Sequence, residues 1–317
     1  MPKEIKITKE YEGVKPKNFL KKTINTPFNT LVKLIKDKRI TLNLKKIKKE
    51  DILKEGDIIK IWKDDILLRQ DETPNKAKKD LSINIIYECE DFIVFNKLPF
   101  IVVQGAQDHD TSLSLHLTFY KDRIGDKNNF EYSHVHRLDK ETSGALLVAK
   151  NRIALRGLNQ IFKEKKVKKK YICLCKGEFA KDRGEIDVFM IRNPQGAKEK
   201  MSVAKHKDSN NKKNTQRSIS FYRVIDKFEY ENETFSLVEV EIKTGVTHQI
   251  RVHMKHLGHP IVADKMYGNS IVNSMFQDML QRQFLHASHL EFAYKGKNYK
   301  FEAPLTKDLE NFLYKLK

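Results

Sequence analysis

The spacing of hydrophobic residues in the first 63 positions predicts a small α/β module. Hydrophobic side chains recur with a helical period over residues 28–35. Residues 40–44 then alternate between hydrophobic and polar side chains, which predicts a short strand that ends at Leu44. A Gly-Asp pair at 56–57 is a turn signal before a second predicted strand at 58–61.

Beyond residue 80 most hydrophobic patterns indicate strands. The spacing predicts two strands around a Glu90-Asp91 turn, the first beginning near Ile83, and further strands at 145–150, 170–175, 218–224 and 235–242. Helices are predicted at 112–121 behind a Ser112 cap, at 152–166, and at 247–257 behind a Thr247 cap. The polar stretch 195–216 predicts a surface loop. The expected fold class is α+β with a mixed, mainly antiparallel sheet.

A polar stretch separates these two patterns. Residues 64–80 hold few large hydrophobic side chains and contain a Pro74-Asn75 turn signal. The length of 317 residues also favours two domains. We therefore expect a first domain at 1–70, a linker at 71–82 and a second domain at 83–317.

Positive charge dominates the composition. The chain has 61 Lys and Arg against 42 Asp and Glu, a net charge of +19. Residues 1–63 alone hold 18 basic and 8 acidic residues, and the segment Lys33–Lys49 holds eight basic residues against Asp37. Such an excess favours a nucleic acid partner, although a lysine-rich soluble surface would produce the same total.

The composition also argues against several classes of protein. No hydrophobic run approaches the roughly 18 residues of a membrane span, and the first residues contain no apolar segment of a secretory signal. Three cysteines with irregular spacing do not form a disulfide framework or a cysteine zinc site. The chain contains no phosphate-binding loop, dinucleotide fingerprint or nucleophile elbow. We expect a cytoplasmic protein without a membrane partner.

One segment concentrates residues that can carry chemistry. Residues 134–144 contain two histidines, an arginine and Asp139, and they fit neither helical nor strand periodicity. A loop at the start of a buried strand can hold a reactive carboxylate rigidly. The alternative is a charged turn in which Asp139 pairs with Arg137 or Lys140.

A second group of candidates lies further along the chain. His248 and Arg251 share one face of the predicted helix, whereas Ile250 and Met254 point toward the core. A surface ion pair is the alternative for the arginine. Four histidines at 248, 253, 256 and 259 lack metalloprotease spacing, so we expect no metal. Tyr171, after three lysines, could stack on a base or simply pack in the core.

Several of these motifs together resemble the RluA-type pseudouridine synthases. Residues 136–144, His-Arg-Leu-Asp-Lys-Glu-Thr-Ser-Gly, are similar to the signature loop of that family, in which a histidine precedes Arg-Leu-Asp. Lys170-Tyr171 and residues 244–253, 258–261, 267–268 and 284–287 match later motifs in the same order. The resemblance extends over residues 83–305.

The N-terminal module resembles the α-L RNA-binding domain. The matching residues lie at 17–20, 34–43 and 56–59. An α-L module before this catalytic domain is similar to the RluC-like and RluD-like ribosomal RNA enzymes, and the central stretch is closer to the RluC-like branch. The resemblance implies RNA contacts by the basic residues Lys33, Lys36, Lys38, Arg39, Lys45 and Lys46.

The resemblance also implies a reaction and roles for the site residues. Uridine becomes pseudouridine when the N-glycosidic bond breaks, the uracil rotates and carbon 5 rejoins the sugar, which requires no cofactor. The implied roles are Asp139 as the essential catalytic residue, Arg251 as the partner that keeps it ionised, Tyr171 against the target base, Ile250 as an apolar wall, and Arg137, with His136 beside it, as RNA contacts in base flipping.

Three positions depart from the family pattern. Val246 stands where the family usually has Arg, Leu44 where the α-L module often has Gly, and Asn96-Lys97-Leu98-Pro99 replaces Asn-Lys-Pro. None of them is an implied catalytic residue, so they concern the choice of RNA target.

Two function classes remain at this stage. The leading one is a monomeric pseudouridine synthase that acts on large-subunit ribosomal RNA or on a ribosome assembly intermediate. The alternative is an RNA-binding assembly factor whose catalytic domain is inert. A histidine-based metal enzyme is a third, weaker interpretation.

Overall fold

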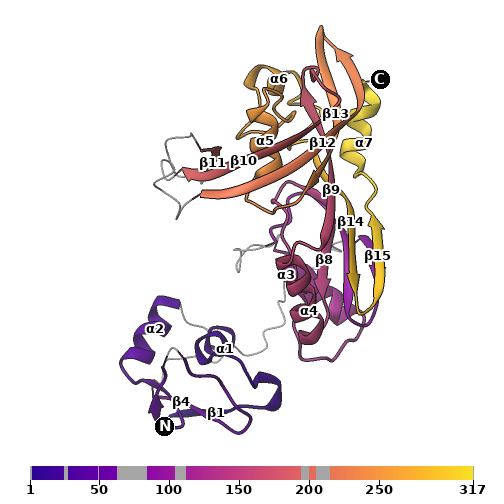
Figure 1. Cartoon of the computed structure of the whole chain (residues 1–317). Coiled ribbons are helices and arrows are strands. Elements are labelled where there is room, and N and C mark those ends of the chain that lie inside the picture. Colours follow the sequence, from indigo (N-terminus) through magenta and orange to yellow (C-terminus); the bar gives the residue numbers. More distant parts are fainter. Residues whose placement is uncertain are drawn as a thin grey trace. The chain divides into compact units, whose positions relative to one another are not determined.

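A computed structural model describes residues 2–24, 28–48, 50–62, 84–103, 112–193, 200–204 and 215–316. The chain separates into an N-terminal unit, Met1–Asp80, and a C-terminal unit, Leu81–Lys317 (Figure 1). The expected linker at 71–82 and the expected strand start at Ile83 lie outside the described residues. Among the described helices, none has both the length and the apolar character needed to cross a membrane.

In its described residues the N-terminal unit has a four-stranded sheet in the order β1-β4-β2-β3 and two α-helices. Its elements are β1 (Lys3–Lys6), a short 3-10 helix (Lys9–Tyr11), α1 (Pro16–Thr23), α2 (Phe28–Lys36), β2 (Ile40–Leu42), β3 (Lys45–Lys46) and β4 (Ile58–Ile61). Leu20, Leu31, Ile40 and Ile59 belong to one buried cluster. The helical period at 28–35 and the strand at 58–61 are thereby confirmed.

The prediction that Leu44 belongs to a strand is wrong. β2 ends at Leu42, and Asn43 and Leu44 both have positive φ values, 49° and 63°. Two consecutive residues in this region form the tight turn of a β-hairpin, here between β2 and β3. Leu44 is therefore exposed instead of reaching the core.

The C-terminal unit is built on one sheet with the strand order β11-β10-β12-β13-β9-β14-β8-β6-β5, to which β15 and β7 are added at β14 and β8. Nearly all pairings are antiparallel, and β14 with β8 is the parallel one among the described strands. The strands are β5 (Asn84–Glu88), β6 (Phe92–Lys97), β7 (Ser133–His134), β8 (Ser143–Ala149), β9 (Val167–Lys176), β10 (Arg183–Asn193), β11 (Lys200–Val203), β12 (Thr215–Tyr230), β13 (Glu233–Ile242), β14 (Leu285–Tyr294) and β15 (Lys297–Glu302). This confirms the expected α+β class.

Helices cover both faces of this sheet. They are α3 (Leu113–Arg123), α4 (Arg152–Lys163), α5 (Gln249–His256), α6 (Ser270–Met275) and α7 (Lys307–Leu316). Residues of α3, α5, α6 and α7 share one core cluster, whereas α4 packs in another with the alternate side chains of β6 and β8. β8 is buried along its whole length because both of its faces are covered, which explains its continuous hydrophobic run.

Three predicted elements need correction. The stretch 195–216 is not all loop, because β11 occupies 200–203 and β12 begins at Thr215. Met201 gives β11 a buried anchor, which the polar composition of this stretch conceals. Helix α5 begins after His248, not at Thr247, and α4 ends at Lys163, where its apolar face ends.

Gly144 fixes where the 136–144 loop enters the sheet. Its φ of 114° is in the range that favours glycine, and a Cβ there would lie 2.2 Å from the backbone oxygen of Ala287. β8 pairs with β14 at this point, with Gly144 opposite Ala287. The close approach of the two backbones therefore requires glycine and places the loop beside β14.

Candidate active site

Asp139 lies in the loop between β7 and β8, and its side chain is partly buried. Three backbone carbonyls of this loop are held in place. The oxygen of Asp139 accepts from the Thr142 N–H, that of Lys140 from the Lys97 ammonium, and that of Glu141 from Arg282. The carboxylate is thus mounted on a backbone that has little freedom to shift.

Lys97 is a buried cation at the end of β6. Its Nζ donates to the carbonyl oxygens of Leu98, Ile101 and Lys140 at 2.9–3.3 Å. Burial lowers the pKa of Lys97 to about 7, with a further decrease from Arg282 and an opposing increase from Asp139. This ammonium joins the 98–101 turn to the Asp139 loop.

Arg282 is the second buried cation beneath the loop, with none of its surface exposed. Its guanidinium binds both carboxylate oxygens of Asp308 at the start of α7, at 2.7 and 3.1 Å. It also donates to the Glu141 carbonyl, at 3.0 Å, and to Ser143 Oγ, at 3.1 Å. Every part of the guanidinium fork is used, so Arg282 fastens the loop to the C-terminal helix.

A cavity of about 570 Å³ opens beside Asp139, a size typical of a ligand pocket. Among its described lining residues Asp139 is the one carboxylate, and the cationic side chains are Arg137, Lys163, Lys165, Lys169, Arg217, Lys243 and Arg251. A cavity with this charge pattern suits a polyanion that must approach a single acid.

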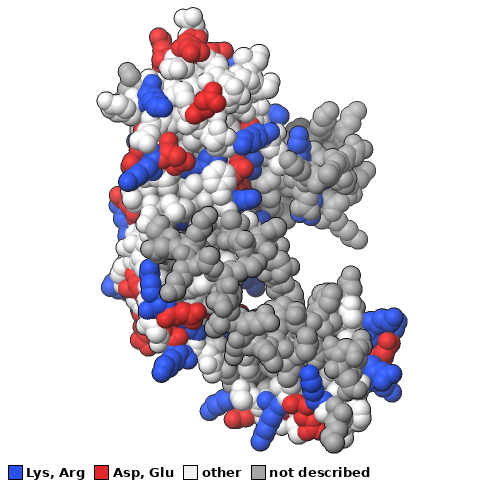
Figure 2. Space-filling model, turned by 180° about the vertical axis from the view of Figure 1, so that it is seen from behind, with Lys and Arg blue, Asp and Glu red and all other residues white. Residues whose placement is uncertain are grey.

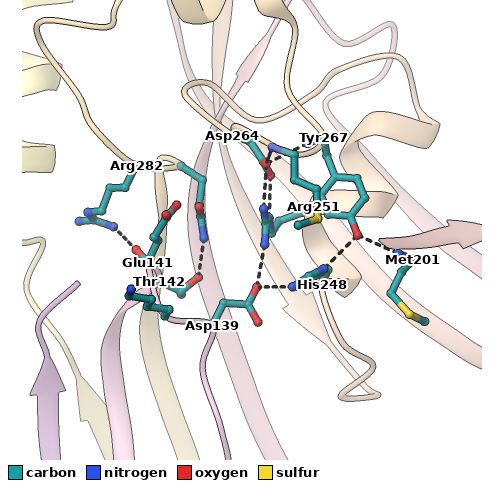
Figure 3. A network of polar contacts seen from close by, with 12 residues as sticks. Asp139, Glu141, Thr142, Met201, His248, Arg251, Asp264, Tyr267 and Arg282 are labelled. Carbon is teal, nitrogen blue, oxygen red and sulfur yellow. Dashed lines mark hydrogen bonds and ion pairs between the residues drawn. The ribbon is translucent and has the colours of Figure 1, made fainter. Parts of the chain in front are cut away.

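Arg251 connects Asp139 to a second, fully buried carboxylate. Its Nη1 donates to Asp139 Oδ2 at 3.3 Å, while Nε and Nη2 bind Asp264 at 2.7 and 2.8 Å (Figure 3). Asp264 also accepts from the N–H groups of Met266 and Tyr267. The pKa of Asp264 is lowered although burial opposes this, because Arg251 and the two N–H groups stabilise its charge.

His248 is a second side chain close to the Asp139 carboxylate, beside Arg251. Its Nε2 lies 4.0 Å from Asp139 Oδ2, and its Nδ1 lies 2.9 Å from the Tyr267 hydroxyl. The residue is the N-cap of α5 with φ 57°, a left-handed conformation that is uncommon outside glycine. Burial lowers the pKa of His248, partly offset by the charge of Asp139. The prediction that His248 and Arg251 share a face of one helix is wrong for His248, because α5 begins at Gln249 and His248 has a left-handed backbone; both side chains still lie within 4.0 Å of Asp139 Oδ2.

Tyr171 and Ile250 both line the cavity, beside other apolar side chains such as Phe162 and Leu285; the proposed contacts of Tyr171 and Ile250 with the target base stay predictions. These two residues come from β9 and α5, and both are buried. The pKa of Tyr171 is raised, first by burial and then by the charge of Asp139. Tyr171 therefore stays a neutral phenol whose ring faces the same space as the carboxylate.

Arg137 and His136 also line the cavity but differ in their surroundings. Arg137 is exposed, as a residue that enters RNA would have to be. The ring of His136 stacks on Phe162 at 5.0 Å, and its Nε2 accepts from the Leu147 N–H at 3.1 Å. Burial lowers the pKa of His136 to about 3. This neutral ring supports the wall, and its direct contact with RNA stays a prediction.

Lys169 places a further cation inside the cavity, two residues before Tyr171 on the same face of β9. Burial lowers its pKa to about 8. Val246, where the family usually has Arg, packs instead beside Met201 and Tyr267. The positive charge near residues 244–247 is therefore supplied by Lys169 and Lys243.

Lys33, Lys36, Lys38, Arg39, Lys45 and Lys46, the six basic residues expected to contact RNA, are all exposed in the N-terminal unit. They lie on α2, in the turn that follows it and on β3. In the view of Figure 2, basic side chains project from the coloured surface of this unit, and acidic side chains lie among them, as they do on the C-terminal unit. No described residue holds any of these six in a recorded ion pair.

Four site residues escaped the sequence analysis as functional candidates: Lys97, Asp264, Tyr267 and Arg282. Lys97 was noted only as part of a changed motif, and Tyr267 only as part of a matching one. The sequence offered one signal for Asp264, which is the first acidic residue after the four histidines and follows the turn at Gly258 and Pro260. Nothing in the local pattern around Arg282 indicated its contacts with residues 141 and 308.

Comparison with known proteins places this geometry in a family. Residues 91–256 match the family of RNA pseudouridylate synthases. Ribosomal large subunit pseudouridine synthase C of Buchnera aphidicola subsp. Acyrthosiphon pisum is 32% identical over 316 residues, which cover 98% of this chain and 96% of that protein. An uncharacterized RNA pseudouridine synthase of Bacillus subtilis is 30% identical and covers 99% of this chain and 98% of its own length.

A solved structure agrees with these relatives. Human RNA Pseudouridylate Synthase Domain Containing 1 superimposes with a TM-score of 0.57 and 28% identity, covering 74% of this chain and 94% of that chain. The family match, the full-length relatives and the common fold confirm the resemblance found in the motifs. The chain belongs to the RNA pseudouridylate synthase family and is an isomerase that converts uridine to pseudouridine.

Proposed function

We propose that this enzyme isomerises specific uridines of large-subunit ribosomal RNA and that Asp139 is its essential catalytic residue. The substrate follows from relatives whose names state the large ribosomal subunit and which match the chain over nearly its full length. The observation that carries the role of Asp139 is its position as the one acid among the described residues of a cationic cavity.

The chemistry needs one carboxylate close to the flipped nucleotide. Asp139 acts as nucleophile or base on the ribose or the uracil, while Tyr171 lies against the base and Ile250 supplies an apolar surface. Arg137, at the cavity rim, takes the place that the flipped base leaves in the RNA. The reaction changes no oxidation state, so it needs no redox cofactor.

The N-terminal unit contributes affinity in this proposal. Six exposed basic residues on α2, the following turn and β3 bind phosphates of the folded RNA around the target. Such contacts depend on salt and orient the RNA without reading its sequence. We place the boundary between this RNA-binding domain and the catalytic domain within the linker at 71–82.

The direct test is pseudouridine mapping of large-subunit RNA transcripts after incubation with the wild type, Asp139→Asn or Glu141→Gln. Wild type and Glu141→Gln should produce the same pseudouridines, because the Glu141 contact with Arg282 is made by its backbone. Asp139→Asn should bind the same RNA and produce none. Product from Asp139→Asn would contradict the proposed role of the carboxylate.

A deletion strain can distinguish an active enzyme from an inert assembly factor. A strain that lacks the gene should lose particular pseudouridines from its large-subunit RNA, and Asp139→Asn should not restore them. An unchanged pseudouridine map, with ribosome assembly rescued equally by both proteins, would favour the inert RNA-binding factor.

A further inference from the structure

The two donors that face Asp139 are both supported by one short turn, residues 264–267. Asp264 binds Arg251 through two oxygens, and Tyr267 contacts the ring nitrogen of His248 that points away from Asp139 (Figure 3). The turn itself is tightly folded, since the N–H groups of Met266 and Tyr267 return to Asp264 Oδ1 at 2.9 Å.

The hydrogen bonds of Tyr267 determine where His248 carries its proton. The N–H of Met201, in β11, donates to the Tyr267 hydroxyl oxygen at 2.9 Å. The hydroxyl hydrogen is then free to donate to His248 Nδ1, at 2.9 Å. The reverse direction would leave that hydrogen without a partner in a buried site. A neutral His248 therefore holds its proton on Nε2, which faces Asp139.

Asp264 determines the direction of Arg251 in the same way. Its two oxygens occupy Nε and Nη2, so the guanidinium plane is set and Nη1 is the group that remains for Asp139. The ring of Tyr267 lies 5.0 Å from the guanidinium carbon and limits its movement from one side. Arg251 is thus oriented before any RNA arrives.

Both donors face the same oxygen of the Asp139 carboxylate. Arg251 Nη1 lies 3.3 Å and His248 Nε2 4.0 Å from Asp139 Oδ2. Oδ1 has no hydrogen bond or ion pair recorded with the described residues. A separation of 4.0 Å is too long for a hydrogen bond, so without RNA the interaction of His248 with Oδ2 is electrostatic, whereas Arg251 donates to Oδ2 directly.

We propose that the 264–267 turn is the positioning element of the active site. Asp264 aligns Arg251, and Tyr267 holds His248 as the Nε2–H tautomer, so that Asp139 Oδ2 is held and Oδ1 is presented to the nucleotide. Through Met201 the same hydroxyl connects β11 to this arrangement. The inference rests on the proposed catalytic role of Asp139.

The tautomer can be tested without any reaction. In the RNA-free protein, nitrogen-15 NMR of the histidine rings, with His248 assigned from a His248→Gln difference spectrum, should show Nε2 protonated and Nδ1 unprotonated. Tyr267→Phe should convert His248 to a mixture of tautomers, whereas Tyr299→Phe, the same change in another core cluster, should leave it unchanged. A wild-type His248 protonated on Nδ1, or no change in Tyr267→Phe, would overturn the proposal.

Single-turnover rates at saturating RNA test the consequence for catalysis. Tyr267→Phe should lower the rate roughly 10-fold and Asp264→Asn roughly 100-fold, the sizes expected for one neutral and one charged hydrogen-bond network. The RNA dissociation constant should change less than about 2-fold in both, because neither side chain is proposed to touch RNA. Equal losses in rate and binding would indicate a merely structural role.

A double-mutant cycle separates positioning from packing. If Tyr267 acts through His248, adding Tyr267→Phe to His248→Gln should cause no further loss of rate. Additive losses would overturn this part of the proposal. Thermal unfolding of each variant checks folding, and Tyr267→Phe remains informative even if Asp264→Asn is unstable. An active Asp139→Asn would refute the proposed function, while the NMR result would still decide the tautomer.

Discussion

The two units of this protein differ in whether their polar and charged side chains are exposed or buried. Thr41 is the one buried polar side chain among the described residues of the N-terminal unit, where most described lysines are exposed and none is buried. The C-terminal unit buries Lys97, Arg251, Asp264 and Arg282, each with charged or carbonyl partners. Exposed cations can bind RNA phosphates wherever these lie, whereas buried ones hold a reactive group in one place. In this comparison the N-terminal unit contributes affinity for RNA, and the C-terminal unit positions the reactive group.

The largest expected effect comes from removing a buried charge. Arg282→Met should destabilise the C-terminal unit by about 3–5 kcal/mol, because Asp308 and four further oxygen acceptors lose their donor. Chemical denaturation followed by far-ultraviolet circular dichroism measures the loss. Arg156→Met, an exposed arginine on α4, is the control and should change stability little. Similar stability of both variants would contradict the view that Arg282 supports the loop.

Acidification should affect the two units differently. His253 and His286 are fully buried, and burial lowers the pKa of each to about 4, whereas residues 1–63 contain no histidine. Between pH 6.5 and 4 the unfolded chain binds protons that the folded one does not, so stability falls with falling pH. From pH 7 to pH 5 these two histidines should lower the stability of the C-terminal unit by roughly 3 kcal/mol, and His136, whose pKa is lowered to about 3, adds to this loss.

The chain contains its own probe for that comparison. Trp62 is the single tryptophan and belongs to the N-terminal unit, so its fluorescence reports the unfolding of that unit. Denaturation at pH 7 and pH 5 should shift the circular dichroism transition and leave the Trp62 transition nearly unchanged. A parallel shift of both transitions would mean that the buried histidines do not set the acid sensitivity.

Loss of surface lysines should weaken RNA binding without affecting the chemical step. Replacing Lys33, Lys36 and Lys38 by Gln should lower the slope of log affinity against log salt by up to about 2.7, roughly 0.9 for each lost phosphate contact. The rate at saturating RNA should stay unchanged. Filter binding over a salt series measures the slope, and the matched control replaces Lys181, Lys297 and Lys300 of the C-terminal unit. Equal slopes for both triple variants would remove the special role of the N-terminal lysines.

The smallest expected effect concerns helix starts. Ser112, Asn151 and Asn269 cap helices in the C-terminal unit through their side chains, whereas Lys15 before α1 makes no such bond. Lys15→Ser should stabilise the N-terminal unit by about 0.5–1 kcal/mol, and Asn151→Ala should destabilise the C-terminal unit by about 1 kcal/mol. Trp62 fluorescence and circular dichroism report the two changes separately. Destabilisation by Lys15→Ser together with stabilisation by Asn151→Ala would show that these caps do not contribute to the stability of either unit.

Elements that depend on local sequence signals were predicted correctly. The helix at 28–35, the Ser112 cap and the buried strand from residue 145 follow from side-chain periodicity within single segments. Prediction failed at β11, where Met201 is the one buried hydrophobic residue among the described positions of a polar stretch, and at Thr247. β10 does alternate at Ile186, Val188 and Met190, a readable pattern at which we predicted no strand.

The sequence by itself determined the family, the fold class and the candidates Asp139, Tyr171 and Arg251, because ordered motifs and hydrophobic periods are properties of the chain. Only the tertiary structure showed that Asp264 and Tyr267 support the partners of Asp139, and that Arg282 joins the loop to α7. These contacts connect segments far apart in the chain, and a buried charge is stable only where such partners converge. No local pattern encodes that convergence, so it emerges with the folded core.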